Sequence, residues 1–142
     1  MAITARHAPA GLFSLLRVAN VLENRVDAKL SPIGLSLPKL AALDRLVKAG
    51  GSLTLGHLAE RLACVKSNVT QLVDRLEAEG LVARTPDPED GRLRLAVITD
   101  AGRARYEDGI RVQQQAEQEL FSTLTDAEAH QLADLIAKLE RR

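Results

Sequence analysis

The chain has 142 residues, enough for one domain-sized core or for a small lobe with helices that pack against a partner. Hydrophobic residues make up 46% of it but aromatic residues only 2%, so the core must consist of Leu, Val, Ile and Ala, a composition that suits helices. Lys and Arg number 19, as do Asp and Glu, and this balance gives no overall signal for nucleic-acid binding. Any nucleic-acid site must therefore come from a local cluster of positive charge.

Several classes of function find no support in the sequence. The single cysteine, Cys64, excludes an intramolecular disulfide, and the three histidines lie far apart, so neither a metal nor a cofactor is expected. No apolar run is long enough to span a membrane, and the first residues lack the apolar core of a signal peptide, which predicts a cytoplasmic protein. The sequence contains no nucleophile-elbow, zinc-protease or phosphate-loop motif, so we expect no enzyme.

The first two predicted elements are helices. Apolar residues repeat at helical spacing from Pro9 to about Leu30, where Ser31–Gly34 breaks the pattern. The stripe consists of Leu12, Leu15, Leu16, Ala19, Leu22 and Val26. Ser36 is placed to cap a second helix, and two glycines at residues 50–51 should end it.

A short predicted strand, residues 52–54, precedes two further helices. Thr54 should cap the first, over residues 55–62, and a connection of three residues leads to the second, over residues 66–79. In each helix apolar residues recur at i, i+3, i+4 and i+7, so both helices bury one face in a shared core. Two helices joined by so short a turn have the geometry of a helix-turn-helix.

The helix over residues 66–79 keeps a polar outer face. A helix in the major groove reads bases mainly through its N-terminal turns, where Asn and Gln bond adenine and Ser or Thr reach bases or phosphates. The candidate contacts on this face are Lys66, Ser67, Asn68, Thr70, Gln71 and Arg75. An ordinary solvated face would have the same composition, and it is the following hairpin that favours the DNA-reading interpretation.

Gly80 should end this helix, and a hairpin follows. Two predicted strands, residues 81–84 and 92–98, flank the turn-rich segment 85–91. The second strand alternates between an apolar and a basic face: Leu93, Leu95 and Val97 against Arg92 and Arg94. As a wing, the hairpin would lay its arginines along phosphates or into a minor groove: Arg84, Arg92 and Arg94. A solvated hairpin with several acids of its own is the alternative.

Two more helices complete the chain. Thr99 should cap a long helix to about Ser122, whose middle is strongly polar, and Thr125–Glu128 matches a capping box at the start of the last helix. A helix with so polar a middle buries little surface on its own. We therefore expect these helices and the first one to meet their counterparts in a second subunit.

Segments in the middle of the chain carry a family resemblance. They are Leu58-Ala-Glu-Arg-Leu62, Lys66-Ser-x-Val-Thr-x-Leu-Val-Asp-Arg-Leu-Glu-x-x-Gly-Leu-Val-x-Arg84, and Pro86-Asp-Pro-Glu-Asp-x-Arg92 with Ile98-Thr-x-x-Gly102. In them the chain resembles the MarR family of transcriptional regulators. The resemblance implies a mainly α fold with a small antiparallel β wing. Residues 1–35 would form an N-terminal dimerisation helix, residues 36–99 a winged helix-turn-helix domain, and residues 100–142 C-terminal dimerisation helices.

The resemblance also implies a function. Members of the family bind inverted-repeat operators in double-stranded DNA as homodimers, and a small ligand or oxidation often alters their affinity. Here the recognition helix 66–79 would enter the major groove and the wing 84–94 would lie at the minor groove or backbone, with Asp90 holding Arg92 in place. We expect a DNA-binding regulator that acts as a repressor. A winged-helix module for protein contacts, without specific DNA binding, is the alternative that the zero net charge keeps open.

Three positions depart from the family pattern. Gly91 stands where a second wing arginine is common, so we expect weaker wing binding. Val65 stands where a capping Ser is usual, so either Ser67 caps a helix that starts later or this helix end has no cap. Gln71 stands where an arginine is frequent, so no operator sequence is carried over from relatives.

Regulation rests on the resemblance alone. It implies a ligand pocket between the terminal helices and the winged lobe, which Arg17, Asn20, Asn24 and Arg25 would line, although a solvated helix face explains these residues equally well. The sequence names no ligand. Cys64 allows control by oxidation, but a small buried hydrophobe is the favoured interpretation of a lone cysteine in a turn.

Overall fold

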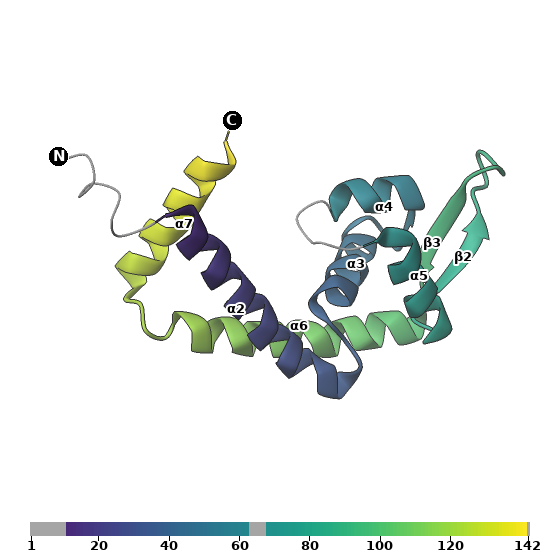
Figure 1. The fold of residues 1–142 in the computed structure, drawn as a ribbon. Coiled ribbons are helices and arrows are strands. Elements are labelled where there is room, and N and C mark those ends of the chain that lie inside the picture. The colour runs from purple at the N-terminus through teal and green to yellow at the C-terminus, as the bar shows by residue number, and fades with distance from the viewer. Residues whose placement is uncertain (1–10, 63–67, 142) are drawn as a thin grey trace.

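The computed structural model of the chain describes residues 11–62 and 68–141 (Figure 1). Its elements in chain order are α2 (Leu12–Leu30), the 3₁₀ turn η1 (Ser31–Ile33), α3 (Leu37–Lys48), β1 (Ser52–Thr54), α4 (Leu55–Arg61), α5 (Val69–Ala78), β2 (Val82–Pro86), β3 (Arg94–Ile98), α6 (Asp100–Phe121) and α7 (Asp126–Glu140). This mainly helical fold with a small antiparallel sheet confirms the predicted fold class. No helix within these two ranges is long and apolar enough to cross a membrane.

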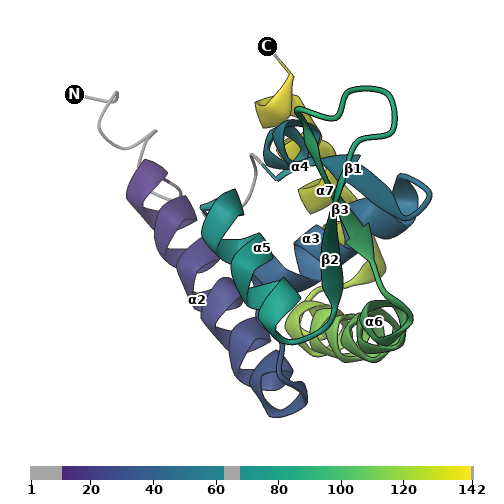
Figure 2. The same ribbon diagram turned by 90° about the vertical axis from the view of Figure 1, so that its right-hand side faces the viewer.

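Helix α6 joins two parts of the molecule (Figure 1). One part, which we call the winged lobe, consists of α3, α4, α5 and the three strands, and it sits on the N-terminal half of α6. Helix α2 crosses the C-terminal half of α6, and α7 follows α6 in the chain after a turn. The outer parts of α2 and α7 project away from the winged lobe, and Figure 2 shows that these two helices lie apart from each other.

Leucine dominates the core of the winged lobe and of its junction with α2, as the composition predicts. The largest fully buried side chains are Leu30, Leu40, Leu43, Leu46, Leu58, Leu62, Leu76, Leu81 and Val73. In the sheet, β3 lies between β1 and β2 and is antiparallel to both. Ala96 pairs with Leu53 on one side and with Arg84 on the other. Residues 52–54 therefore form the predicted strand, and its partner is the wing strand β3.

Local caps set the helix boundaries, as predicted. A Ser or Thr side chain accepts a hydrogen bond from the N–H three residues later at four helix starts: Ser36 before α3, Thr54 before α4, Thr99 before α6 and Thr125 before α7. Glu128 completes the predicted capping box with Thr125. Each cap satisfies one N–H that the helix leaves free and contributes about 1 kcal/mol. After α5, Gly80 adopts the left-handed conformation with a φ of 76°, which ends that helix.

Helix α5 begins later than the predicted range 66–79. It spans Val69–Ala78, and Asn68 caps it by accepting a hydrogen bond from the N–H of Gln71 at 3.3 Å. The helix does start later, as one alternative predicts, but its capping residue is Asn68 and not Ser67, and the alternative of an end without a cap is wrong. Asn is as good an N-cap as Ser, so the cap moves one residue along the chain.

The leucine-rich face of β3 is not the buried one. Leu95 and Val97 share a face that is partly open to solvent, and Leu93, predicted to join them, lies just before the strand and is 47% exposed. Ala96 and Ile98 form the core side instead. Ala96 is fully buried, and β3 contacts α3.

Two glycines bring α6 close to the rest of the fold. A Cβ added at Gly102 would lie 2.1 Å from the carbonyl oxygen of Leu81, and one at Gly109 would lie 2.7 Å from the Cδ1 atoms of Leu35 and Leu40. Both glycines are buried and stand seven positions apart, which places them on one face of the helix. Close contact along this face therefore fixes the position of the winged lobe on α6.

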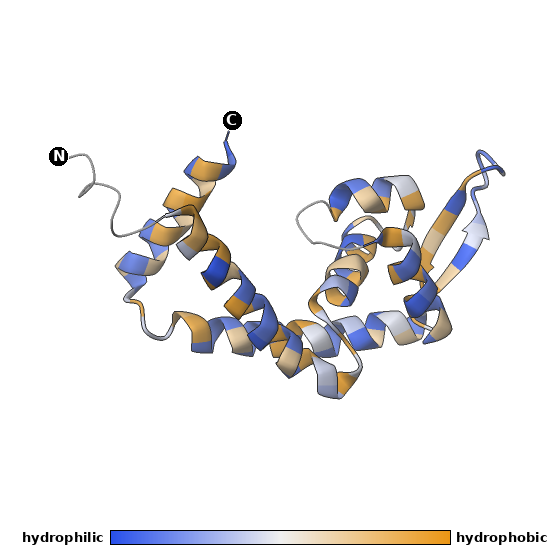
Figure 3. Cartoon of the chain, in the orientation of Figure 1, coloured by the Kyte–Doolittle hydropathy of each residue, from blue (hydrophilic) through white to orange (hydrophobic). Residues whose placement is uncertain are grey.

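Helices α2 and α7 carry apolar faces that the single chain leaves uncovered (Figure 3). The large exposed apolar residues on these helices and at the end of α6 are Leu12, Phe13, Leu15, Leu16, Val18, Val21, Phe121, Leu132, Leu135, Ile136 and Leu139. Only Val26 and Leu30 are buried in α2, and no residue is buried in α7. Apolar surfaces of this extent mark sites of association with another surface.

Candidate nucleic-acid interface

Helix α5, the predicted recognition helix, has one buried and one solvent-facing side. Leu72, Val73 and Leu76 are buried in the core, whereas the polar residues Thr70, Gln71, Asp74 and Arg75 are exposed. The predicted contacts Lys66 and Ser67 lie outside the described residues, as does Cys64. The described part of the predicted reading face is therefore open to a ligand as large as a DNA duplex.

Asn68 has a structural role as well as a predicted binding role. Its side-chain oxygen is occupied by the N–H of Gln71, so it cannot also accept a hydrogen bond from adenine in the usual two-point contact. Its amide group keeps two N–H donors, which can reach a phosphate or a base acceptor. Asn68 is thus better suited to donate a hydrogen bond to a phosphate or a base than to make the two-point contact with adenine.

A small hollow of about 140 Å³ lies between the start of α3 and the start of α5. Its polar lining includes Lys39 from α3 and Asn68, Gln71 and Arg75 from α5. The ammonium group of Lys39 is 2.6 Å from the carboxylate of Glu79, which holds it beside the recognition helix. Sequence reasoning missed Lys39, because only the tertiary fold brings α3 next to α5.

At the wing, Asp90 and Arg92 form the contact that the resemblance implies. Nε and Nη2 of Arg92 donate to the two carboxylate oxygens of Asp90 at 3.1 and 3.3 Å, and the Arg92 N–H donates to the same carboxylate at 3.1 Å. The hydrogen bonds from the side chain and backbone of Arg92 lower the pKa of Asp90. The Arg92 side chain is nevertheless 90% exposed, so Asp90 orients the guanidinium without burying it.

Arg84 is differently placed from the free cation that the sequence suggests. Its guanidinium lies 2.6 Å from the carboxylate of Asp74 and 3.3 Å from that of Glu77, and it donates to the carbonyl oxygen of Thr70. These partners all belong to α5, and the Arg84 side chain is only 22% exposed. Arg84 therefore fastens the wing to the recognition helix, and any contact with phosphate would require it to leave these partners.

Two further predicted cations are exposed on the same lobe. Arg75 lies on α5 and Arg94 on β3, and both are exposed. Neither forms an ion pair within residues 11–62 and 68–141. Together with Arg92 they are open to a phosphate, but the acids of α5 and the wing balance the arginines of this surface: Asp74, Glu77, Asp87, Glu89 and Asp90.

Two cavities lie along α6. One, of about 330 Å³, opens between α2 and α6 and is lined by mainly apolar atoms, by Arg25 and by the ion pair of Lys29 with Glu119. The other, of about 290 Å³, opens between α3 and α6 next to Asp44 and Gln113. Of the polar residues predicted to line a ligand pocket, only Arg25 borders the first cavity, and Asn20 and Asn24 bond to each other on the exposed side of α2.

The two successive helices α4 and α5, with the β2–β3 hairpin after them, define a winged helix-turn-helix protein. Comparison with known proteins places the chain more narrowly. Residues 33–93 match the model of the MarR family. The HTH-type transcriptional repressor Rv2887 of Mycobacterium tuberculosis is 32% identical over 135 residues, which cover 95% of this chain and 96% of the relative. The chain belongs to the MarR family and is a transcriptional regulator.

Solved structures agree with this assignment. A probable transcriptional regulator from Pseudomonas aeruginosa superimposes with a TM-score of 0.76 at 31% identity, covering 90% of this chain and 96% of that one. The organohalide-sensing regulator RdhR-CbdbA1625, in its 2,4-dichlorophenol-bound form, superimposes with a TM-score of 0.77 at 22% identity, covering 92% and 80%. At 22% identity, the comparison with RdhR-CbdbA1625 shows that the two chains have the same fold.

Proposed function

We propose that this regulator is a repressor that binds an inverted-repeat operator as a homodimer. In this proposal the outer face of α5 enters the major groove, and Arg92 reaches the adjacent minor groove or backbone. The observation that carries the proposal is the Asp90–Arg92 pair, which aims an exposed guanidinium from the tip of a wing that is fastened to α5. A preoriented arginine loses less conformational freedom when it meets a phosphate or a minor groove.

The site residues follow from this arrangement. The proposed base-reading contacts are Ser67, Asn68, Thr70 and Gln71, and the proposed phosphate contacts are Lys66, Arg75, Arg92 and Arg94. The placement of Lys39 beside α5 supports adding it to the second group. Arg84 and Asp90 are assigned to positioning, because their contacts are with α5 and with Arg92.

The homodimer is proposed from the uncovered faces of α2 and α7. Full burial of one Leu, Ile or Phe side chain stabilises by about 1.5–3 kcal/mol, so covering several of them favours association strongly. A second copy offers the same faces, related by a twofold axis. One recognition helix contacts few base pairs, whereas two helices about 34–36 Å apart read two half-sites on one side of the duplex.

A small-molecule effector is part of the proposal. The cavity between α2 and α6 has mainly apolar walls, which suit a small aromatic ligand. At its edge Lys29 is paired with Glu119 at 2.7 Å, so Arg25 is the cation that we propose meets a negative charge on such a ligand. RdhR-CbdbA1625, which shares the fold, has been solved with 2,4-dichlorophenol. Absence of any shift in melting temperature across a panel of phenols and aromatic acids would remove the effector from the proposal.

The alternative is a winged-helix module that contacts a protein. Zero net charge keeps this alternative open, and the two proposals differ in their dependence on salt. DNA binding releases counterions, so its affinity falls steeply as salt rises, whereas a protein contact responds weakly. The matched relative is a transcriptional repressor, so we propose no enzymatic activity and place the protein in the cytoplasm with its DNA target.

Fluorescence anisotropy tests the proposal directly. The protein is titrated into labelled duplex from the region upstream of its own gene, and into a scrambled duplex, at low and at physiological salt. We expect tighter binding to the upstream duplex and affinity that falls as salt rises. A protein that binds neither duplex at low salt does not have the proposed function, and the protein-contact alternative would replace it.

A further inference from the structure

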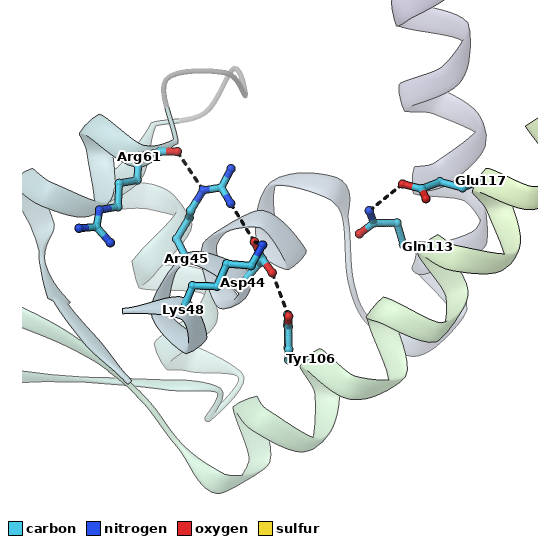
Figure 4. Close-up of polar contacts among 7 residues, drawn as sticks. All are labelled: Asp44, Arg45, Lys48, Arg61, Tyr106, Gln113 and Glu117. Carbon is cyan, nitrogen blue, oxygen red and sulfur yellow. Dashed lines mark hydrogen bonds and ion pairs between the residues drawn. The ribbon is translucent and has the colours of Figure 1, made fainter. Parts of the chain in front are cut away.

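A polar cluster connects α6 to the helix that precedes the recognition helix (Figure 4). At its centre is Asp44 of α3, whose side chain is only 15% exposed. The Tyr106 hydroxyl on α6 donates to one carboxylate oxygen of Asp44 at 2.9 Å. Arg45 and Lys48 bind the other oxygen at 2.8 and 3.1 Å. A carboxylate held by three donors occupies one defined position.

Arg45 carries this connection on to α4. While its Nη1 binds Asp44, its Nε donates to the carbonyl oxygen of Arg61 at 3.2 Å (Figure 4). Arg61 is the last residue of α4, where helix carbonyls lack partners within the helix and favour a cation. Because the guanidinium is planar and rigid, holding two groups at once fixes their relative position. Tyr106 is thereby linked through Asp44 and Arg45 to the end of α4.

The position of this link matters for DNA reading. Helix α4 ends seven residues before Asn68, which caps the recognition helix. At the other end, α6 is one continuous helix from the winged lobe to the region that would face a second subunit. Any rotation of α4 and α5 relative to α6 would change the separation of the two recognition helices in a dimer. A dimer with the wrong separation loses affinity for two half-sites on one side of the duplex.

We propose that Asp44, Arg45 and Tyr106 are positioning residues, which together hold the helix-turn-helix at the angle to α6 that operator binding requires. This proposal rests on the proposed DNA-binding function. The three residues contact no base or phosphate. They act through the end of α4, so they affect the fit to paired half-sites and not the attraction of each lobe for phosphate.

The test compares two disruptive variants with a matched control. Tyr106→Phe removes one hydroxyl and keeps the ring that packs on the core, and Arg45→Lys keeps the charge but cannot hold Asp44 and Arg61 at once. Lys48→Gln is the control, because it removes a cation from the same carboxylate oxygen without disturbing α4 or α6. The Lys48 side chain is 64% exposed, so its replacement should be mild.

Binding is measured by fluorescence anisotropy to a duplex that the wild-type protein has selected from a random pool, and to a scrambled duplex. We expect Tyr106→Phe and Arg45→Lys to weaken binding to the selected duplex by about three- to tenfold. Their binding to the scrambled duplex and the salt slope should stay at the wild-type values, because no phosphate contact is lost. Lys48→Gln should match the wild type on both duplexes.

A spectroscopic measurement separates positioning from general destabilisation. Tyr106 is the only tyrosine and the chain has no tryptophan, so its ultraviolet absorbance and fluorescence report on this cluster alone. We expect the selected duplex to alter the Tyr106 fluorescence in the wild type, and Arg45→Lys to reduce that change while circular dichroism stays the same.

The outcomes distinguish the two proposals. If the wild type prefers the selected duplex and both disruptive variants bind it equally well, the positioning role is wrong and the proposed function stands. If Lys48→Gln weakens binding as much as Arg45→Lys, the effect is one of charge and the positioning role is again wrong. If the wild type binds no duplex, the proposed function and the positioning role both fail.

Discussion

Replacing Gly102 with alanine tests whether backbone contact fixes α6 against the winged lobe. A Cβ at this position would lie 2.1 Å from the carbonyl oxygen of Leu81 and 2.8 Å from Cγ1 of Ile98. Carbon and oxygen atoms that are not bonded stay about 3.3 Å or more apart even in close C–H···O contacts. The nearest atom belongs to the backbone, so no side-chain rotation relieves the contact. Helix α6 would have to move by about 1 Å.

The size of the effect follows from opposing contributions. Alanine is favoured over glycine in a helix by at most about 1 kcal/mol at this position. Overpacking costs about 1–3 kcal/mol. Displacing α6 also weakens two hydrogen bonds of Thr99, from its N–H to Leu81 at 3.1 Å and from its hydroxyl to Gly80 at 2.7 Å. With about 1 kcal/mol for each bond, we expect the free energy of unfolding to fall by about 2–4 kcal/mol.

Gly56→Ala is a matched control, because the same substitution should not lower the free energy of unfolding at this position. Gly56 lies in α4, and an added Cβ there meets no atom within 4 Å. This change should therefore leave stability unchanged or raise it by up to about 1 kcal/mol. Both variants are unfolded in urea at one fixed protein concentration, because association alters apparent stability. A Gly102→Ala protein as stable as the wild type would show that α6 is not held by this contact.

The remaining predictions concern DNA binding, assembly and pH. Arg92→Ala should weaken binding to every duplex and reduce the salt slope by about 1, measured by anisotropy at several salt concentrations, and an unchanged slope would remove the wing from the interface. Gln71→Ala should relax preference at one operator position by about 1–3 kcal/mol, and competition with singly substituted duplexes would reveal no such position if Gln71 reads no base. Leu135→Glu should yield a monomer in light scattering, since the exposed apolar face of α7 then carries a charge, and a retained dimer would contradict the use of that face. The pKa of Asp90 should lie below 3.8, because Arg92 donates to its carboxylate. The contribution of this pair is full above that ordinary value and lost as pH falls through the lowered pKa. An NMR titration in which Arg92→Ala leaves the Asp90 pKa unchanged would refute the contact.

Much of the fold was predictable because its signals are local. A capping side chain such as that of Ser36 or Thr99 bonds a backbone group three residues away, so the sequence alone specifies it. Gly80 ends α5 for an equally local reason, since glycine adopts the left-handed conformation without steric cost. The acid and arginine of the wing also pair across only two residues, as Asp90 and Arg92 do.

Local rules were insufficient where two choices satisfy them equally. Ser67 and Asn68 are both good caps, and the fold uses Asn68. Alternation along β3 separates two faces but does not state which one is inside. The packed structure buries the small Ala96 and leaves the larger Leu95 half-buried, and only the contacts of β3 with other elements, such as α3, decide this.

The sequence by itself determined the order of helices and strands, the caps of α3, α4, α6 and α7 and the exposed face of α5, because these depend on residues a few positions apart. Tertiary structure alone decided the partners of charged groups that are distant in sequence. Arg84 is fastened to Asp74, Lys39 is held beside α5, and Tyr106 reaches Asp44 across 62 residues. A charged side chain takes whichever partner the packed core brings within about 4 Å, and no pattern in the sequence encodes that distance.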